Sequence, residues 1–600
     1  MSLKELRTGQ LLTTFGPGAL VDFPDEALII AGTQDWVYSG TIPVIHEARL
    51  EAKLRLRLQK SYVELRLPPT KEELYGISKT FVRAYAFPQW VQVQEKETAP
   101  GSPRYIRRRL VHRDSLTPDG KYINDAGKKI DVLPIRFVRA CPSGHIGDIN
   151  WPNVVHGGAT THRKLWIEER GTSGELSGIH IVCECGLEKS LSLIFKSGNE
   201  DLGYCDGSRP WFGQYAKELC THRNRALIRS ASNAYFPQLM SVISIPDLVT
   251  PLEDAINSQW SILQAVDDMT RLEAFYSIPQ VQSTLSAFPR ESVLQAILRK
   301  KNGEDILGEM NVKEVEFLAL SSVPKEMPAE IPSGDFFARE LPQKTYSGFD
   351  SRRYFEKIVA VHALREVTAL LGFTRLEPLS KNVDGEYDPS VDLGVALAPI
   401  GLDVNWLPAI ENHGEGIFIQ FRQTEVESWL AHPAVIQYGK KLREAFDSWK
   451  IDHRGSGLEF PGIEYYMAHS LCHIILSAFT LECGYPASSL KERIYTGENG
   501  LGFLIYTASS DAAGTLGGLV QAGRSLTRLM ASALENAKLC SNDPVCSAHE
   551  PDDHDNRYLS GASCHSCLHI PETSCEQWNE LLDRRLVVET LDRKGTAFFS

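Results

Sequence analysis

Toward the carboxyl end of the sequence, four cysteines have the type and spacing of metal ligands. Cys540, Cys546, Cys564 and Cys567 form a C-x5-C-x17-C-x2-C pattern, and Cys575 follows as a fifth candidate. Two pairs of thiolates on tight turns can surround one Zn²⁺ tetrahedrally, with each sulfur about 2.3 Å from the ion. The alternatives are disulfides or buried free cysteines. We favour zinc, because paired cysteines in a chain with no secretory signal bind metal more often than they cross-link.

A second candidate metal site lies in the first half of the chain. Cys141 and His145 bound one short turn-like segment, Cys183 and Cys185 bound another, and each segment follows a stretch with strand character. The two segments are similar to the opposing knuckles of a zinc ribbon, which predicts a ligand set of three cysteines and one histidine. The long insertion between them leaves that set open. Three further residues could complete it or replace its members: Cys205, Cys220 and His222.

Two histidines form a possible helical pair. His469 and His473 are four residues apart in an apolar run that predicts a helix, so both imidazoles lie on one face. A zinc protease carries a glutamate directly after the first histidine of such a pair, but this sequence has Ser470 there. That protease class is therefore excluded. The pair remains either a hydrogen-bonded core feature, which is the commoner case, or a metal site carried by a helix.

Two other motifs of nucleic-acid enzymes are absent or incomplete. No G-x-x-x-x-G-K-[ST] motif occurs, so the sequence predicts no ATP-driven motor. His162, Lys164 and Glu169 are similar to one half of the phospholipase-D nuclease motif, but that motif needs an aspartate and a second copy. The sequence therefore offers no complete catalytic constellation, and we expect a protein that is not an enzyme.

The densest basic stretch of the chain lies at residues 104–113. In an acidic chain it is the best candidate for contact with DNA phosphates, and Tyr105 is available to stack on a base. The alternative is a solvated strand face whose arginines pair with acidic neighbours, and the sequence does not separate the two. The candidate DNA-binding residues are Arg104, Arg107, Arg108, Arg109 and Arg113.

The composition indicates a globular chain of several domains. Its 600 residues exceed the size at which single cores stop growing, and 42% of them are hydrophobic. The net charge of −13 argues against a protein that coats nucleic acid with its whole surface. The first residues lack the apolar segment of a secretory signal, which predicts a cytoplasmic protein whose cysteines stay reduced.

The pattern of apolar residues predicts a mixed α+β, multidomain fold. We expect strands at 53–58 and 416–421, and helices at 251–307, 352–371 and 425–449. The expected regions are a β-rich N-terminal docking region (1–130), a zinc-ribbon-like region (131–245), a helical region (246–345) and a C-terminal α/β zinc-binding domain (346–600).

Several segments resemble known families. The block from 508 to 576, with its cysteines, resembles the zinc-binding, helicase-associated domain at the end of helicases of the MrfA type. The glycine-proline turn at 15–19, the segment from Cys141 to His145 and the stretch 231–237 resemble the DrmB family of the DISARM anti-phage system. This second resemblance spans essentially the whole chain.

The DrmB resemblance implies a subunit of a bacterial defence complex that carries no motor of its own. Such a subunit binds zinc, associates in trans with a superfamily-2 helicase, DrmA, and helps to engage phage DNA, notably ends with single-stranded overhangs. The resemblance implies no catalytic residues. The alternative from the residues alone is a metal-dependent nuclease or hydrolase that uses His469, His473 or the region around His162.

Overall fold

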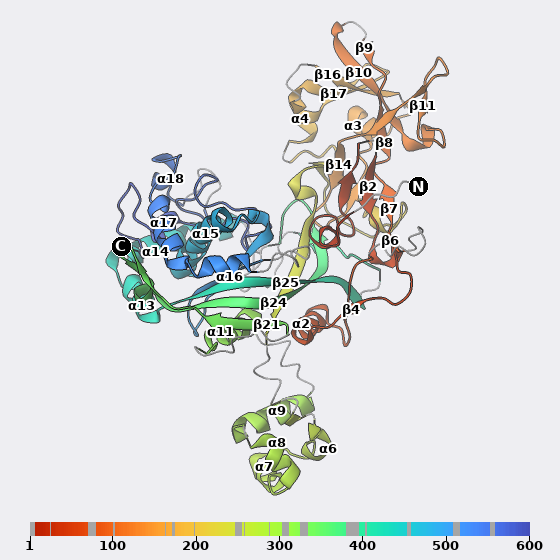
Figure 1. The fold of residues 1–600 in the computed structure, drawn as a ribbon. Coiled ribbons are helices and arrows are strands. Elements are labelled where there is room, and N and C mark those ends of the chain that lie inside the picture. The colour runs from red at the N-terminus through yellow and green to blue at the C-terminus, as the bar shows by residue number, and fades with distance from the viewer. Residues whose placement is uncertain are drawn as a thin grey trace.

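The computed structural model has a long central sheet, with an N-terminal lobe beyond one end and a small helical lobe below it (Figure 1). It describes residues 6–599 except 25, 70–79, 100–101, 163, 171–174, 197, 246–251, 253–254, 257, 287, 303–310, 325–333, 380–394, 403–404, 453–457, 508–516 and 552–557. The described part is mixed α+β, with strands dominating the N-terminal region, which confirms the fold class predicted from the sequence.

The central sheet collects strands from the whole length of the chain. They are β4 (Val44–Ile45), β5 (Glu64–Arg66), β20 (Phe236–Ser244), β21 (Phe336–Glu340), β24 (Phe355–Thr374), β25 (Trp406–Phe421), β26 (Leu490–Tyr495) and β27 (Gly502–Thr507). The main path is β20-β24-β25-β27-β26, antiparallel throughout, and β21 also pairs with β24. The short β5 pairs in parallel with β25 and in antiparallel with β4. N-terminal residues therefore complete a sheet built mainly from the C-terminal half.

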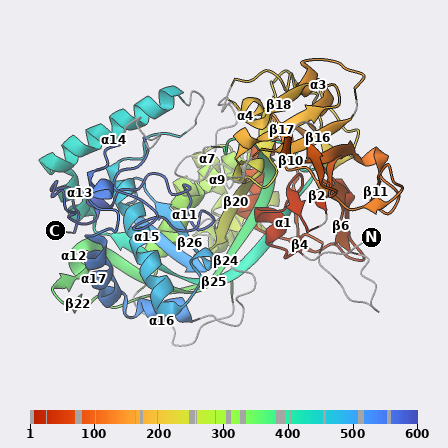
Figure 2. The same ribbon diagram turned by 90° about the horizontal axis from the view of Figure 1, so that it is seen from above.

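Helices cover both faces of this sheet. They are α11 (Val312–Ser321), α13 (Gln423–Leu430), α14 (Pro433–Asp452), α15 (Ile463–Cys483), α16 (Gly518–Gly523) and α17 (Leu526–Ala537). Side chains of a strand alternate between faces. Accordingly, Ile417 and Ile419 of β25 belong to the core under α15 and α17, whereas Phe418 packs against Phe317 of α11. Seen from above, α15 lies over the sheet and α14 lies farther out (Figure 2).

The N-terminal lobe is built from smaller antiparallel sheets. The largest has the order β13 (Val132–Pro134), β8 (Trp90–Val93), β10 (Ser102–His112), β16 (Leu165–Glu169), β17 (Ile179–Cys183) and β18 (Glu188–Ser190), and β9 (Glu97–Ala99) pairs with β10. Two three-stranded sheets lie nearer the central sheet: β1 (Leu20–Asp22), β2 (Ala27–Ile30) and β7 (Ala84–Ala86), and β15 (Ile146–Gly147), β14 (Phe137–Ala140) and β19 (Arg225–Ile228). The turns and the longer connections between these strands carry most of the N-terminal candidate ligands.

The predicted helix at 352–371 is wrong, because most of these residues form β24. From Leu364 to Thr374 the strand is buried at nearly every position, between the helices of one face and the packed side chains of the other. A strand buried on both faces shows a continuous apolar run, so no period of two marks it. Its length of 20 residues also exceeds that of most strands and is typical of a helix.

The predicted strand at 53–58 is also wrong, because these residues end helix α2 (Ala48–Leu58). Leu50 and Leu54 are fully buried and lie four residues apart, which places them on one face of a helix. The strict alternation of leucine with basic residues extends over too short a stretch to outweigh that spacing.

The other predicted elements are confirmed. Residues 251–307 contain α6 (Trp260–Leu263), α7 (Met269–Phe275), α8 (Pro279–Leu285) and α9 (Arg290–Asn302), which share a core of their own. Residues 416–421 lie in β25, and residues 425–449 lie in α13 and α14. A proline, Pro433, begins α14, as the first turn of a helix tolerates.

The predicted domain boundaries stay predictions, but the central sheet crosses all three of them. β21 pairs with β24 across the boundary at 345. β20 pairs with β24 across the boundary at 245, and β5 pairs with β25 across the boundary at 130. Residues 246–251, which follow the predicted boundary at 245, lie outside the described residues. Among the described residues, no helix combines the length and the apolar character needed to cross a bilayer.

Candidate metal centres

The C-terminal cluster brings the four predicted cysteines together. Cys540 follows α17, and Cys546 lies in the short helix α18 (Val545–Ala548). Cys564 and Cys567 are the ends of a tight turn, in which the N–H of Cys567 donates to the Cys564 carbonyl at 3.1 Å. Asp543 shapes the first loop, because its carboxylate accepts hydrogen bonds from the backbone N–H groups of Cys540 and Ser547, at 2.8 and 3.1 Å.

The sulfur positions in this C-terminal cluster fit one tetrahedral ion. The Sγ atoms of Cys540 and Cys564 are 3.5 Å apart, and the Sγ of Cys567 is 3.7 Å from those of Cys546 and Cys564. Sulfurs about 2.3 Å from zinc at tetrahedral angles lie about 3.8 Å from one another. Asn542 donates to the sulfurs of Cys540 and Cys564, each at 3.4 Å, which is the contact that orients thiolate ligands.

A buried arginine holds the loop that carries the first two cysteines of the C-terminal cluster. Arg584 is fully buried, pairs with Asp543 at 2.8 Å and donates to the Ala537 carbonyl at 2.9 Å. A hydrogen bond from Cys567, helped by the charge of Arg584, lowers the pKa of the Cys546 thiol. This lowered pKa favours the thiolate form of Cys546, which is the form that binds metal.

The N-terminal cluster contains Cys141, His145, Cys205 and Cys220. The first two lie on the turn between β14 and β15, and the other two come from the long connection before β19. Cys141 Sγ lies 3.4 Å from His145 Nδ1 and 3.9 Å from Cys220 Sγ, and all four donor atoms lie within 4.8 Å of one another. Three sulfurs and one imidazole nitrogen at these distances form a donor set suited to zinc.

The imidazole of His145 is oriented by a carboxylate. Its Nδ1 faces the sulfurs, and its Nε2 lies 2.5 Å from Glu218 Oε1. A histidine that binds metal through one nitrogen commonly donates from the other nitrogen to a carboxylate, which fixes its tautomer. The hydrogen bond from Cys141 also lowers the pKa of the Cys205 thiol. Glu218 was not identified in the sequence, since a single glutamate carries no motif.

A third, smaller group contains Cys183 and Cys185 with His156. The Nε2 of His156, the last residue of α3 (Trp151–His156), lies 3.3 Å from Cys183 Sγ and 3.7 Å from Cys185 Sγ. The ring of His162 stacks on that of His156 with 5.3 Å between centroids. Because Cys185 is exposed and three ligands leave a fourth position open, this group is the most accessible of the three.

The structure thus corrects one predicted pairing. The sequence placed Cys141 and His145 with Cys183 and Cys185, but these pairs lie in different groups. The ladder of β16, β17 and β18 carries the second pair toward α3, away from the β14–β15 turn. The replacements named in the sequence, Cys205 and Cys220, complete the first group. His222 stays outside it, although its Nδ1 is 3.6 Å from Cys220 Sγ.

The fifth C-terminal candidate, Cys575, lies away from the other four cysteines. It is buried with His469, His473 and Glu492, and it forms a group with them. Cys575 is therefore not part of the group formed by Cys540, Cys546, Cys564 and Cys567. Both histidines are fully buried.

The arginines of β10 face carboxylates. Arg107, Arg108 and Arg109 form ion pairs of 3.2, 3.5 and 3.8 Å, and their side chains are only 16–19% exposed. Their respective partners are Glu97, Glu169 and Asp125. Arg107 also lies over the ring of Trp166, 4.4 Å from its centroid. These contacts favour a strand face paired with acidic neighbours over an open track for phosphates.

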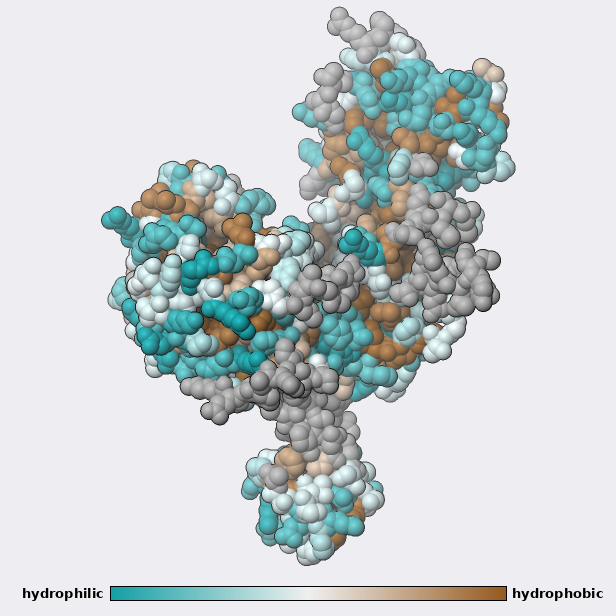
Figure 3. Space-filling view, viewed as in Figure 1, coloured by the Kyte–Doolittle hydropathy of each residue, from teal (hydrophilic) through white to brown (hydrophobic). Residues whose placement is uncertain are grey.

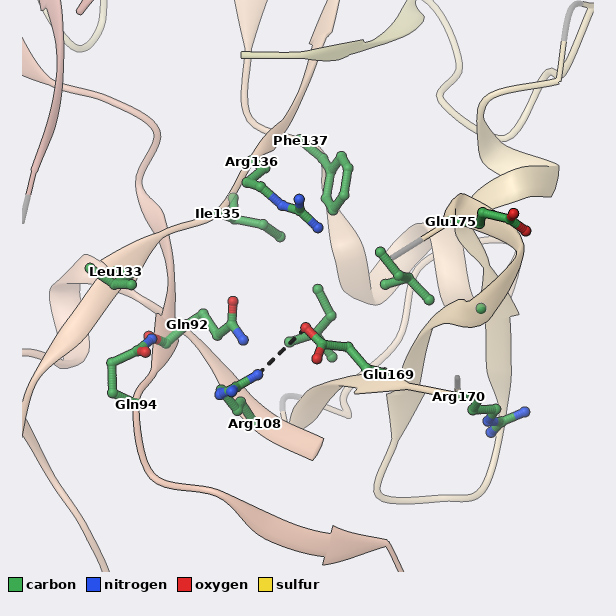
Figure 4. A pocket seen from close by; sticks show the side chains of 13 residues that line it. Gln92, Gln94, Arg108, Leu133, Ile135, Arg136, Phe137, Glu169, Arg170 and Glu175 are labelled. Atoms are coloured by element: carbon green, nitrogen blue, oxygen red, sulfur yellow. Dashed lines mark hydrogen bonds and ion pairs between the residues drawn. The ribbon is translucent and has the colours of Figure 1, made fainter. Parts of the chain in front are cut away.

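The surroundings of Arg108 are of mixed charge. Figure 4 shows Arg108 directed at Glu169 in a pocket of about 430 Å³, with Arg136 on the opposite wall. Arg113 donates to the Pro88 carbonyl at 3.3 Å, and burial lowers its pKa. The side chain of Arg104 lies outside the described residues. The assignment of these arginines to DNA binding stays a prediction.

One arginine outside all motifs joins the segments that carry the family resemblance. Arg375, fully buried after β24, donates to the carbonyls of Gly144, Gly18 and Ala234, the first two at 2.9 and 2.6 Å. These carbonyls belong to the turn from Cys141 to His145, the glycine-proline turn and the stretch 231–237. Gly18 has φ +84°, and a Cβ there would lie 2.5 Å from the ring of Phe373, so this turn requires glycine.

Comparison with known proteins places these features in two families. A domain of unknown function (DUF8724) matches residues 7–236, and the MrfA Zn-binding domain matches residues 471–568. The DISARM protein DrmB of Bacillus paralicheniformis is 34% identical over 517 residues, which cover 82% of this chain and 87% of that protein. The second domain match contains the whole C-terminal cluster, so the carboxyl-terminal part of the chain is a zinc-binding domain.

Proposed function

The chain belongs to the DrmB family of DISARM proteins, and from this we propose that it is a non-motor subunit that binds a separate superfamily-2 helicase, DrmA. Membership in this antiviral defence family and the C-terminal zinc-binding domain confirm the two resemblances found in the sequence. The proposal adds a cytoplasmic site of action, a helicase partner, and contact with phage DNA, notably with single-stranded overhangs.

The proposed zinc ligands follow from the donor geometry. The C-terminal ion is held by Cys540, Cys546, Cys564 and Cys567, and the N-terminal ion by a second set. That second set is Cys141, His145, Cys205 and Cys220. Each ion has four protein ligands and no open position, which is the arrangement of a structural site. A structural zinc contributes on the order of 10 kcal/mol to folding, so it can hold short loops in one conformation.

The observation that carries the helicase contact is the exposure of apolar side chains on the C-terminal loops. Leu539 and Val545 each precede a cysteine of the cluster, and they are 65% and 79% exposed. Figure 3 shows hydrophobic residues at the top of the C-terminal lobe, in the region of α18. A contiguous exposed apolar patch, unlike single scattered apolar residues, is typical of a protein interface. We therefore place the docking surface for the helicase at Leu539 and Val545.

A pull-down with the helicase tests this docking surface. The double variant L539E/V545E places two charges on the surface and leaves the cysteines in place, so we expect zinc content to be kept and helicase binding to fall at least tenfold. The matched control is L481E, because Leu481 is 89% exposed on α15 of the same domain. Equal helicase binding by the double variant and the control would place the interface elsewhere.

The DNA contact is proposed along β10, where phosphates would have to displace carboxylates. The triple variant R107A/R108A/R109A removes the three paired arginines. If each meets one phosphate, the slope of log affinity against log salt for the two-protein complex falls by about 3. An unchanged affinity and slope would assign the arginines to the paired strand face.

A further inference from the structure

The C-terminal domain contains another group of metal-ligand side chains, which shares no residue with the four-cysteine cluster. His469 and His473 lie on α15, Glu492 lies on β26, and Cys575 lies in the segment that follows the zinc loop. All four side chains are buried, and their donor atoms lie within 4.8 Å of one another. His469 and Cys575 also fall outside the residues matched by the zinc-binding domain family.

The hydrogen bonds of the two imidazoles define which nitrogens face the centre of this group. His469 Nδ1 lies 3.2 Å from the Leu581 carbonyl, and His473 Nδ1 lies 2.8 Å from the Leu568 carbonyl. A carbonyl oxygen only accepts, so each Nδ1 carries the hydrogen. In a neutral ring the Nε2 atom then presents a lone pair, and both Nε2 atoms point at the carboxylate of Glu492.

Without a cation, these lone pairs face further lone pairs. His469 Nε2 lies 2.8 Å from Glu492 Oε1, and His473 Nε2 lies 3.1 Å from Glu492 Oε2. The second contact lacks hydrogen-bond geometry, and both of its atoms are buried without a hydrogen-bond partner. A buried nitrogen and a buried oxygen that face each other without a hydrogen bond destabilise the folded state. A positive ion between them would satisfy both.

Charge balance favours a divalent ion over protons. One proton on His469 would balance the carboxylate but leave the contact between His473 and Glu492 unsatisfied. Protonation of both rings would bury two positive charges against one carboxylate. A divalent ion with one carboxylate and one thiolate is neutral, which is the arrangement that burial penalises least. The Cys575 sulfur accepts backbone N–H bonds from Gln577 and Asn579 at 3.4 and 3.2 Å. Such N–H contacts are typical of metal-bound thiolates.

We propose that His469, His473, Glu492 and Cys575 bind a further Zn²⁺ in the C-terminal domain. Two imidazole nitrogens, one carboxylate oxygen and one sulfur form a closed tetrahedral set for this ion. The ion fastens the segment around Cys575 to helix α15 and strand β26, beneath the loop that holds the four-cysteine cluster. Because the site is closed and buried, its role is structural, and it does not depend on the proposed helicase.

Metal counting on the full-length chain tests the site. The mass difference between native and denatured protein gives the number of bound ions. We expect H473Q to bind one zinc fewer than the unchanged protein, and H473C, which restores a ligand, to regain it. The control H432Q removes an exposed histidine and keeps the full count. A full zinc count in folded H473Q would overturn the proposal.

A measurement without substitutions covers the case in which H473Q fails to fold. Replacement of zinc by ¹¹³Cd gives one resonance per site, and its shift depends strongly on the number of sulfur ligands. The proposed site has one sulfur, whereas the N-terminal and C-terminal clusters have three and four. We expect a resonance from a one-sulfur site in the full-length protein. Its absence would show that the group holds no metal.

Discussion

Replacement of Arg375 by methionine should loosen the N-terminal lobe from the central sheet. Methionine keeps an unbranched apolar stem against the ring of Phe373, 4.7 Å from the guanidinium, but it removes all donors. The carbonyls of Gly18, Gly144 and Ala234 then lose these hydrogen bonds. Each buried carbonyl left without a donor destabilises the fold by about 1–3 kcal/mol. Removal of the buried charge also removes its desolvation penalty, which offsets part of this loss. We expect a net local destabilisation of about 4 kcal/mol.

Hydrogen exchange is the suitable assay, because a chain of several domains has no single unfolding free energy. A local loss of about 4 kcal/mol corresponds to exchange about 10³ times faster. We expect this acceleration in peptides that contain the glycine-proline turn, the turn from Cys141 to His145 and the stretch 231–237. The control is R352M, which removes an exposed arginine that pairs with Asp350. Unchanged exchange in the three peptides, or the same change in R352M, would refute the reasoning.

Two further substitutions test the site and the fold. E218Q should lower the affinity of the N-terminal cluster for zinc about 10–100-fold, measured in competition with a chelator. The reason is that an amide accepts the hydrogen bond of His145 less strongly than the carboxylate, which lies at 2.5 Å. Equal affinity would mean that Glu218 does not orient the imidazole. L54A should destabilise helix α2 locally by about 2–5 kcal/mol, seen as faster hydrogen exchange in its peptides, since Leu54 is fully buried. L56A should change that exchange little, since Leu56 is 56% exposed, and similar effects of the two would contradict helix α2.

The sequence was sufficient where spacing alone brings ligands together. The turn from Cys564 to Cys567 and the nearby Cys540 and Cys546 form one group, as their local pattern predicted. The N-terminal set was only partly predictable, because Cys205 reaches Cys141 through a long connection without a motif. Pairing in such cases depends on sheet topology, which single-sequence patterns do not determine.

The same limit explains what was missed entirely. His156 lies 27 residues before Cys183, and only the pairing of strands places them together. Glu492 lies on a strand and His469 on a helix, so their contact has no local signal beyond the histidine pair itself. Strand β24 was mistaken for a helix because burial on both faces removes the alternation that identifies strands. Arg375 carried no signal either, since its partners are backbone carbonyls distant in sequence.

Native mass spectrometry of the chain purified with the proposed helicase partner tests most directly whether a zinc-held C-terminal loop binds that helicase. We expect C564S to lose one zinc and the helicase together, and C483S to keep both, because Cys483 lies at the end of α15 outside the metal groups found among the described residues. The contradicting result is a folded chain that has no metal at the four cysteines and still binds the helicase.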